Sequence, residues 1–237
     1  MLNTGKIAFI STLFVAAPLY AAEGDSQWLG ETSLGIVSTS GNTDTNTINF
    51  STKLENNREQ WKHLFMLNTL NSSSEGKSTA ERYVLIAKSN YMIDDVSYAF
   101  GRVSYEDDRF SGFEYQATET LGYGRHLLQK PALKLNVEGG PGIRQSKAEN
   151  ASNENEGILY LSGNLKWDIS QNAVFTEDLF TEIGEDITIT KSVTGLKSQI
   201  NGDLAMKVTF TAKHTSKVPA QKKKVDTETA VSLVYSF

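Results

Sequence analysis

The carboxyl-terminal segment of the chain alternates apolar with smaller side chains and stops on an aromatic residue. Its apolar face is formed by Val231, Leu233, Tyr235 and Phe237, and the positions between them hold serine and valine. An exposed strand of this kind would promote aggregation of a soluble protein, because its free edge and its apolar face both invite pairing. A closed barrel in lipid removes both problems. We therefore interpret these four residues as the assembly signal of an outer-membrane β-barrel.

The amino terminus has the three-part pattern of a secretory signal peptide. Lys6 precedes an apolar run over residues 7–17, and small residues follow at Ala21 and Ala22. The run is about half the roughly 20 residues that a transmembrane helix needs. We expect residues 1–21 to be a cleaved signal peptide and residues 22–237 to form an outer-membrane barrel. Cleavage after Ala22 is the alternative.

Composition narrows the possible chemistry. The chain has no cysteine, which removes thiol catalysis and cysteine-metal sites, and its three histidines leave little for a metal site. It carries 23 basic against 28 acidic residues, a net charge of −5, and loss of Lys6 with the signal peptide makes the balance more acidic. This balance argues against general binding of nucleic acid. We expect no cofactor.

Between the two ends, many segments of about ten residues have an apolar side chain at every second position. In one of them Leu159, Leu161 and Trp167 share a face, while Lys166 and Asp168 lie on the other. Charged residues at this frequency are hard to bury in a soluble core, so the polar face is expected to line a barrel lumen. The segments cover residues 28–38, 46–55, 61–71, 80–91, 97–105, 115–125, 132–144, 157–169, 173–183, 190–200, 204–215 and 227–237.

The connections between these segments support the same architecture. Short connections near 56–60, 93–96, 127–131, 170–172 and 201–203 alternate with longer ones over 72–79, 106–114, 146–156 and 216–226. Outer-membrane barrels have short periplasmic turns, longer outer loops and an even number of strands. The predicted fold is therefore all-β, a transmembrane antiparallel up-and-down β-barrel of about 12 strands. Segments 61–71 and 97–105 alternate poorly, and Val84 and Ile86 are more apolar than lumen positions should be.

Several tracts resemble a known family. They are Ser40-Gly41-Asn42-Thr43, Thr79-Ala80-Glu81-Arg82-Tyr83, the tract 108–116 (DRFSGFEYQ), Gly140-Pro141-Gly142 and Val234-Tyr235-Ser236-Phe237. With these tracts the chain resembles the salt-induced outer-membrane protein family, a domain of unknown function (family 481), over nearly all of the mature protein. The resemblance implies an outer-membrane location, a barrel and a tie to salt stress. It implies no catalytic residues.

The charged positions of the expected lumen are the candidate functional residues. Basic candidates are Lys53, Arg82, Lys88, Arg125, Lys166, Lys207 and Lys213, and acidic candidates are Glu55, Glu106 and Glu138. Mixed charges can pair across a narrow interior and close it, or they can set a field that selects small charged solutes. Twelve strands lie between the eight of filled barrels and the 16 to 18 of open porins, so barrel size leaves both outcomes open.

Three further features are candidates for a catalytic or ligand-binding site. His214, with Ser216 two residues on, is the histidine nearest the outer rim, but its outward register favours the lipid-headgroup zone over a hydrolase site. The run Glu106, Asp107 and Asp108 could form a protease site or bind calcium, but it fits no calcium loop. A loop held by internal ion pairs or by lipopolysaccharide-bridging cations is the favoured account. Lysines 222–224 form a solvated loop or contact lipopolysaccharide phosphates.

These observations lead to one hypothesis and three alternatives. We expect a non-enzymatic barrel that maintains the envelope under salt or osmotic stress, the stress part being implied by the family. The alternatives are a narrow channel for small charged solutes, an outer-membrane lipid hydrolase and a soluble ligand-binding barrel. Expected partners are outer-membrane lipid, lipopolysaccharide and, during biogenesis, the barrel assembly machinery, with small charged solutes as further candidates.

Overall fold

A computed structural model of the protein describes residues 27–39, 45–109, 111–149, 152–219 and 222–237. The expected signal peptide, with its cleavage positions at Ala21 and Ala22, lies outside the described residues. Within them, no helix is long and apolar enough to cross a membrane.

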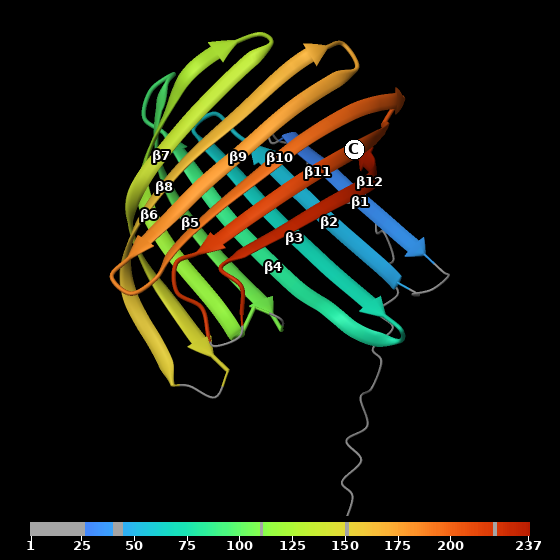
Figure 1. Cartoon of the computed structure of the whole chain (residues 1–237). Helices are drawn as coiled ribbons and strands as arrows, with labels where there is room; N and C mark the ends of the chain where they lie inside the picture. Colours follow the sequence, from blue (N-terminus) through green and yellow to red (C-terminus); the bar gives the residue numbers. More distant parts are fainter. Residues whose placement is uncertain (1–26, 40–44, 110, 150–151, 220–221) are drawn as a thin grey trace, which may run out of the picture.

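Twelve antiparallel strands form a closed barrel in which each strand pairs with its neighbours in sequence and β1 pairs with β12 (Figure 1). This confirms the predicted fold class. The strands are β1 (Gln27–Thr39), β2 (Thr45–Asn57), β3 (Trp61–Ser74), β4 (Lys77–Met92), β5 (Ser97–Asp108), β6 (Phe113–Lys130), β7 (Leu133–Ala148), β8 (Asn153–Ser170), β9 (Ala173–Gly184), β10 (Thr188–Asn201), β11 (Leu204–Thr215) and β12 (Val225–Ser236).

Side chains alternate between the outer surface and the lumen along each strand, as the pleat of a β-strand requires. On β8, Leu159, Leu161 and Trp167 face outward and are 42 to 47% exposed, whereas Ile158 and Tyr160 face the lumen and are 6 and 5% exposed. The large apolar side chains exposed on the outer surface suit the acyl chains of a bilayer.

Strands β3 and β5 lack the polar alternation because their lumen faces carry apolar side chains. Pairing with β2 turns Leu64, Met66 and Leu70 of β3 inward, and pairing with β4 turns Tyr98 and Phe100 of β5 inward. Both lumen faces therefore resemble a packed protein interior. A polarity pattern could not assign them, because apolar residues occupy both sides of these strands.

Three predicted long outer connections are shorter in the structure. Those over 106–114 and 146–156 reduce to the four residues between β5 and β6 and between β7 and β8, and the largest difference is at 72–79. The sequence predicts a long connection over residues 72–79, but β3 and β4 continue to Ser74 and Lys77 and meet in a turn of Glu75 and Gly76. Both turn residues have positive φ, 52° and 71°, as tight hairpin turns require. The strands are longer than the membrane band demands, so part of the sequence assigned to a loop is strand.

The carboxyl-terminal residue closes the barrel. The backbone groups of Phe237 exchange two hydrogen bonds with Gly30 of β1, at 2.7 and 2.9 Å. A Cβ at position 30 would overlap with the Phe237 ring, so glycine makes room for the terminal aromatic side chain. The predicted assembly segment thus forms one edge of the closing seam.

The outer surface also carries a carboxylate. Glu177 on β9 shares the outward register of Leu179, and its two oxygens accept hydrogen bonds of 2.6 Å from the hydroxyls of Ser192 and Thr194 on β10. These bonds lower the cost of placing a carboxylate on a lipid-facing surface.

Candidate functional site

The lumen carries most of the predicted site residues. Strand register turns Lys53, Arg82, Lys88, Glu138, Lys166 and Lys207 toward the interior, together with Glu55, Glu106 and Lys213. The structure therefore brings all but one of the candidates to one interior surface.

Arg125 is the exception, and its lumen assignment is corrected. It pairs with Ser97, next to the outward-facing Tyr123, whose hydroxyl donates to the Ser97 hydroxyl. This register places Arg125 on the outer surface at the periplasmic end of β6. The field of Arg125 contributes to lowering the pKa of Asp94 in the β4–β5 turn, although the main cause is the backbone N–H of Val96.

Glu138 on β7 is the centre of one buried ion-pair cluster. Its carboxylate is paired with the Lys88 ammonium from β4 and accepts hydrogen bonds from the Tyr98 hydroxyl at 2.7 Å and the Ser162 hydroxyl at 3.2 Å. Lys88 also lies 5.2 Å from the centroid of the Phe100 ring. The Glu138 side chain is 2% exposed, so this cluster fills its part of the lumen.

A second buried cluster lies nearer the outer end. The Arg144 side chain is fully buried and binds Glu156 at 2.5 Å and Glu182 at 3.5 Å. Arg102 approaches the same Glu182 carboxylate at 3.6 Å and stacks over the Tyr160 ring at 5.2 Å. The guanidinium groups and carboxylates satisfy one another, which buried charges require.

Two glycines make room for the aromatic side chains that pack beside these clusters. Tyr98, Phe100 and Tyr160 form a buried apolar group. A Cβ at Gly124 would overlap with the Tyr98 ring, and one at Gly122 would lie 2.7 Å from the Phe100 ring. The glycines of β6 therefore allow β5 aromatics to fill the lumen.

Two ion pairs cross the lumen itself. Lys213 on β11 binds Glu106 on β5 at 2.6 Å, and these strands are six positions apart in either direction around the barrel. Arg82 on β4 pairs with Glu228 on β12, four strands away. We call these the cross-lumen ion pairs. Lys213 and Glu106 lie on opposite walls and are 13 and 19% exposed, so their ion pair spans the lumen near its outer end.

Ion pairs nearer the periplasmic end are more open to water. Glu31 binds Lys197 at 2.7 Å and Lys207 at 3.9 Å, with all three side chains 27 to 31% exposed. Lys53 and Glu55 form a 2.6 Å pair on β2 and are 44 and 37% exposed. Exposed pairs of this kind contribute little to stability.

Interior charges that the sequence did not single out include Arg102, Arg144 and Glu182. Arg144 ends the predicted segment 132–144, and Glu182 lies in the predicted segment 173–183, so both were placed on strands. Strict alternation along β7 from Glu138 would have turned Arg144 inward. The pairing of Arg144 with Glu182 could not be inferred, because it joins strands whose relative register is set by the closed barrel.

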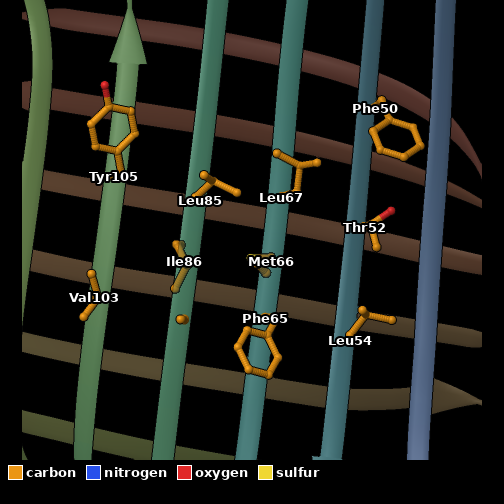
Figure 2. A pocket seen from close by; sticks show the side chains of 11 residues that line it. Phe50, Thr52, Leu54, Phe65, Met66, Leu67, Leu85, Ile86, Val103 and Tyr105 are labelled. Atoms are coloured by element: carbon orange, nitrogen blue, oxygen red, sulfur yellow. The ribbon is translucent and has the colours of Figure 1, made fainter. Parts of the chain in front are cut away.

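The interior of β1–β4 is less filled. Met66 and Ile86 face the lumen between the outward-facing Phe65, Leu67 and Leu85 (Figure 2). We call the interior-facing apolar side chains of β3 and β4 the interior apolar strip. It consists of Leu64, Met66, Leu70, Val84 and Ile86. Four of the five are half-buried, so they border open lumen and not packed side chains.

On the opposite side of the same strands lies an apolar groove of about 500 Å³ on the outer surface, bordered by side chains of β2–β5. Phe50, Phe65, Leu85 and Tyr105 project into it (Figure 2). Lipid acyl chains are the natural occupants of such a groove in a membrane barrel.

The other predicted features lie near the outer end. His214 faces outward between Thr190 and Val225, and the Ser216 hydroxyl oxygen accepts the backbone N–H of Thr188. This outward register agrees with the lipid-headgroup position predicted for His214, and the lipid hydrolase stays the disfavoured alternative.

Two residues of the predicted acidic loop form ion pairs with other strands. Glu106 belongs to a cross-lumen ion pair, while Arg109 binds Glu81 of β4 at 2.6 Å and not the run itself. The hydrogen bond and charge of Glu81 raise the pKa of Arg109 above its ordinary value. The ion pairs of Glu106 and Arg109 thus join this loop to other strands, and the charge of Asp107 also acts on Arg109.

A family model described as "Protein of unknown function, DUF481" matches residues 32–237. The chain belongs to this family. "Uncharacterized protein YdiY" of Escherichia coli (strain K12) is 29% identical over 209 residues, which cover 88% of this chain and 82% of YdiY. The predicted membership of family 481 is thereby confirmed.

Solved structures with a similar fold include the translocator domain of the autotransporter NalP from Neisseria meningitidis and the KdgM porin. The first has a TM-score of 0.46 at 13% identity and covers 92% of this chain and 91% of that domain. The second has a TM-score of 0.46 at 11% identity and covers 89% of this chain and 99% of the porin. At these identities the likeness concerns the barrel fold alone.

Proposed function

We propose that this DUF481 barrel is a non-enzymatic outer-membrane protein whose lumen is closed along its axis and which maintains the envelope under salt or osmotic stress. The observation that carries the closed lumen is the Lys213–Glu106 ion pair between opposite walls. The stress part rests on the family resemblance of the sequence. A cleaved signal peptide over residues 1–21 would deliver the chain to the periplasm and the barrel assembly machinery.

Conductance of the refolded protein in a planar bilayer tests the closed lumen. The wild-type barrel should be silent, with heat-modifiable gel migration showing that it is folded. The Lys213→Met/Glu106→Gln variant should give reproducible conductance steps, because it removes the pair that joins the opposite walls. A Lys53→Met/Glu55→Gln variant, which changes an exposed pair on one strand, should stay silent.

A narrow channel for small charged solutes is the second candidate. The half-buried interior of β1–β4 favours it, because water can reach side chains there. Reproducible steps from the wild-type barrel would establish this candidate and contradict the closed lumen. Neutralising Arg82 or Lys166 should then change the step size and the anion preference.

The stress role is tested in cells. A strain that lacks the gene should grow more slowly than its parent in high-salt medium and take up a hydrophobic antibiotic faster, and the wild-type gene should restore both properties. Equal growth and equal uptake in high salt would contradict the stress role and leave the closed lumen unaffected.

A further inference from the structure

The barrel closes at a seam between β1 and β12 that is paired over part of its length. β1 pairs with β2 along its whole length, but with β12 only over Glu31–Leu34, in addition to the Gly30–Phe237 hydrogen bonds. Within the described strands, residues 35–39 and 225–232 carry no pairing to each other. The two strands run apart from the carboxyl terminus toward their other ends (Figure 1). The unpaired part is the outer half of the seam.

The backbone pairing between β1 and β12 ends next to Gly35. The side chain of Asn49, from β2, lies over Gly35 and accepts a 3.3 Å hydrogen bond from the Ser232 hydroxyl of β12. A Cβ at position 35 would overlap with the Asn49 amide oxygen and lie 2.5 Å from the Val231 carbonyl oxygen. Glycine at this position therefore lets a side-chain bridge hold β12 where the backbone ladder ends.

Beyond this bridge, β12 keeps its pairing with β11 but has no backbone pairing with β1 among the described residues. Glu228, in this part of β12, pairs across the lumen with Arg82 on β4. Arg82 lies directly opposite Leu70 in the β3–β4 ladder, at the outer end of the interior apolar strip. An opening between the outer halves of β1 and β12 would therefore face a guanidinium group and then a run of apolar side chains.

Two connections meet at the outer end of the barrel. The β11–β12 connection reaches the β5–β6 connection, where Pro219 and Lys222 pack on Gly112. Gly112 has φ of 87°, which favours glycine, and a Cβ there would lie 2.9 Å from Pro219. Because β11 and β5 are opposite one another, this contact joins opposite sides of the mouth, whereas the outer half of the seam opens from the membrane toward the strip.

We propose that an anionic amphiphile with one hydrocarbon chain passes sideways through the outer half of the β1–β12 seam and binds inside the barrel. Its chain lies on the interior apolar strip, and its head group binds Arg82 in competition with Glu228. This site goes beyond the proposed function, because it requires no passage of solute along the barrel axis. Backbone N–H and C=O groups at the unpaired edges need partners in a membrane, which a polar head group supplies during passage.

The dimensions and polarity of the site match an outer-leaflet molecule. The strip runs from Leu70 to Leu64, about 20 Å at roughly 3.3 Å per residue, against about 15 Å for the acyl layer of one leaflet. The guanidinium lies at its outer end, and the Lys88–Glu138 pair lies at its periplasmic end, because Lys88 is opposite Leu64. The bound molecule keeps the orientation that it has in the leaflet.

Equilibrium binding of radiolabelled hexadecanoate to the protein in phosphatidylcholine vesicles tests the site, with protein-free vesicles as background. Met66→Gln/Ile86→Gln should weaken binding by about tenfold, because the chain would desolvate two amides. Val193→Gln is the matched control, since Val193 also faces the lumen but lies outside the strip on β10. It should bind as the wild type does, and gel migration shows that both variants fold. Equal binding by the strip variant would overturn the proposal.

The position of the head group is tested by comparing the binding of a charged and an uncharged ligand. Arg82→Gln should weaken hexadecanoate binding by about tenfold and leave binding of the uncharged hexadecan-1-ol unchanged. Glu228→Gln should strengthen hexadecanoate binding by a few-fold, because it removes the competing carboxylate. Equal loss of the acid and the alcohol in Arg82→Gln would overturn the assigned head-group position.

The absence of cysteine in the chain makes the route testable. Ile36→Cys/Val231→Cys joins outward positions beyond the end of the ladder, by a disulfide or, where the sulfurs stay apart, by a bis-maleimide. Cross-linking should slow hexadecanoate uptake by about tenfold or more if the seam carries most of the flux. Leu34→Cys/Leu233→Cys joins an existing pair and should not change uptake. Wild-type uptake through the cross-linked outer seam would overturn the lateral route.

Discussion

The interior faces of β5–β9 and of β1–β4 belong to the same barrel, yet side chains fill them to different degrees. On β5–β9, Tyr98, Phe100, Glu138, Arg144 and Glu182 are all 6% exposed or less. On β1–β4, Val84 is the large interior side chain that reaches this level among the described residues, and most others are half-buried. We refer to these as the filled half and the open half of the lumen.

The difference shows that the side chains on a polar lumen face can either pack into a filled interior or border open space. The filled half combines aromatic rings, paired guanidinium groups and glycines that leave room for the rings. The open half has small hydroxyls and the interior apolar strip, and its long side chains Glu31, Arg82 and Lys88 reach partners on other strands, without packed aromatic rings beside the strip among the described residues. Packing, and not the number of charges, therefore distinguishes the two halves.

The largest expected contrast comes from breaking one ion pair in each half. Arg144→Ala should destabilise the barrel by about 3 to 5 kcal/mol, because Glu156 and Glu182 lose their buried partner. Lys53→Ala should cost about 0 to 1 kcal/mol, because its pair with Glu55 is exposed. Urea unfolding in lipid vesicles measures both. Similar losses in the two variants would contradict the division into a filled and an open half.

Glycine substitutions test where close approach is required. Gly35→Ala should destabilise by about 1 to 3 kcal/mol, because the methyl group overlaps with Asn49 and approaches the Val231 carbonyl. Gly163→Ala on β8 should be close to neutral, because nothing lies within 4 Å of its Cβ position. The free energies of unfolding of the two variants give the comparison. A neutral Gly35→Ala would mean that the Asn49 bridge adjusts at no cost.

Removal of single hydroxyl groups sharpens the comparison between the filled half and the outer surface. Tyr98→Phe should cost about 1 kcal/mol, because the buried Glu138 loses one donor and keeps Lys88 and Ser162. Tyr123→Phe on the outer surface should cost about 0.5 kcal/mol or less, because its bond to Ser97 joins two neutral hydroxyls. The reverse order, measured by the same unfolding experiment, would contradict the account of the Glu138 cluster.

The smallest expected effect is at the β4–β5 turn between the two halves. The pKa of Asp94 is lowered from 3.8, chiefly by the backbone N–H of Val96, so the carboxylate favours the folded turn above pH 3.8. That contribution is lost as the pH falls through the lowered pKa. Asp94→Asn should therefore flatten the pH dependence of unfolding below pH 3.8. An unchanged acid profile would assign no stabilising role to this carboxylate.

The sequence predicted the strands more accurately than the loops. It also predicted which residues face the lumen more accurately on strands with regular alternation than on strands with similar residues on both faces. Lys53, Lys166 and Lys207 were placed in the lumen by simple alternation, and the structure agrees. The prediction for Arg125 is wrong because the outward face of β6 mixes the charged Glu119 and Arg125 with the apolar Leu121 and Tyr123. A shift of one residue in register reverses every side chain, so errors of this kind arise where few apolar residues mark the outer surface.

Local information was sufficient for the architecture. Alternation with period two, the terminal Phe237 and short turns between segments are properties of neighbouring residues, and together they specify twelve antiparallel strands in lipid. The cross-lumen ion pairs, the Arg144–Glu182 contact and the end of the seam at Gly35 join residues that are distant along the chain. Closure of the barrel decides which of these face one another, because strand register and curvature act on all twelve strands at once.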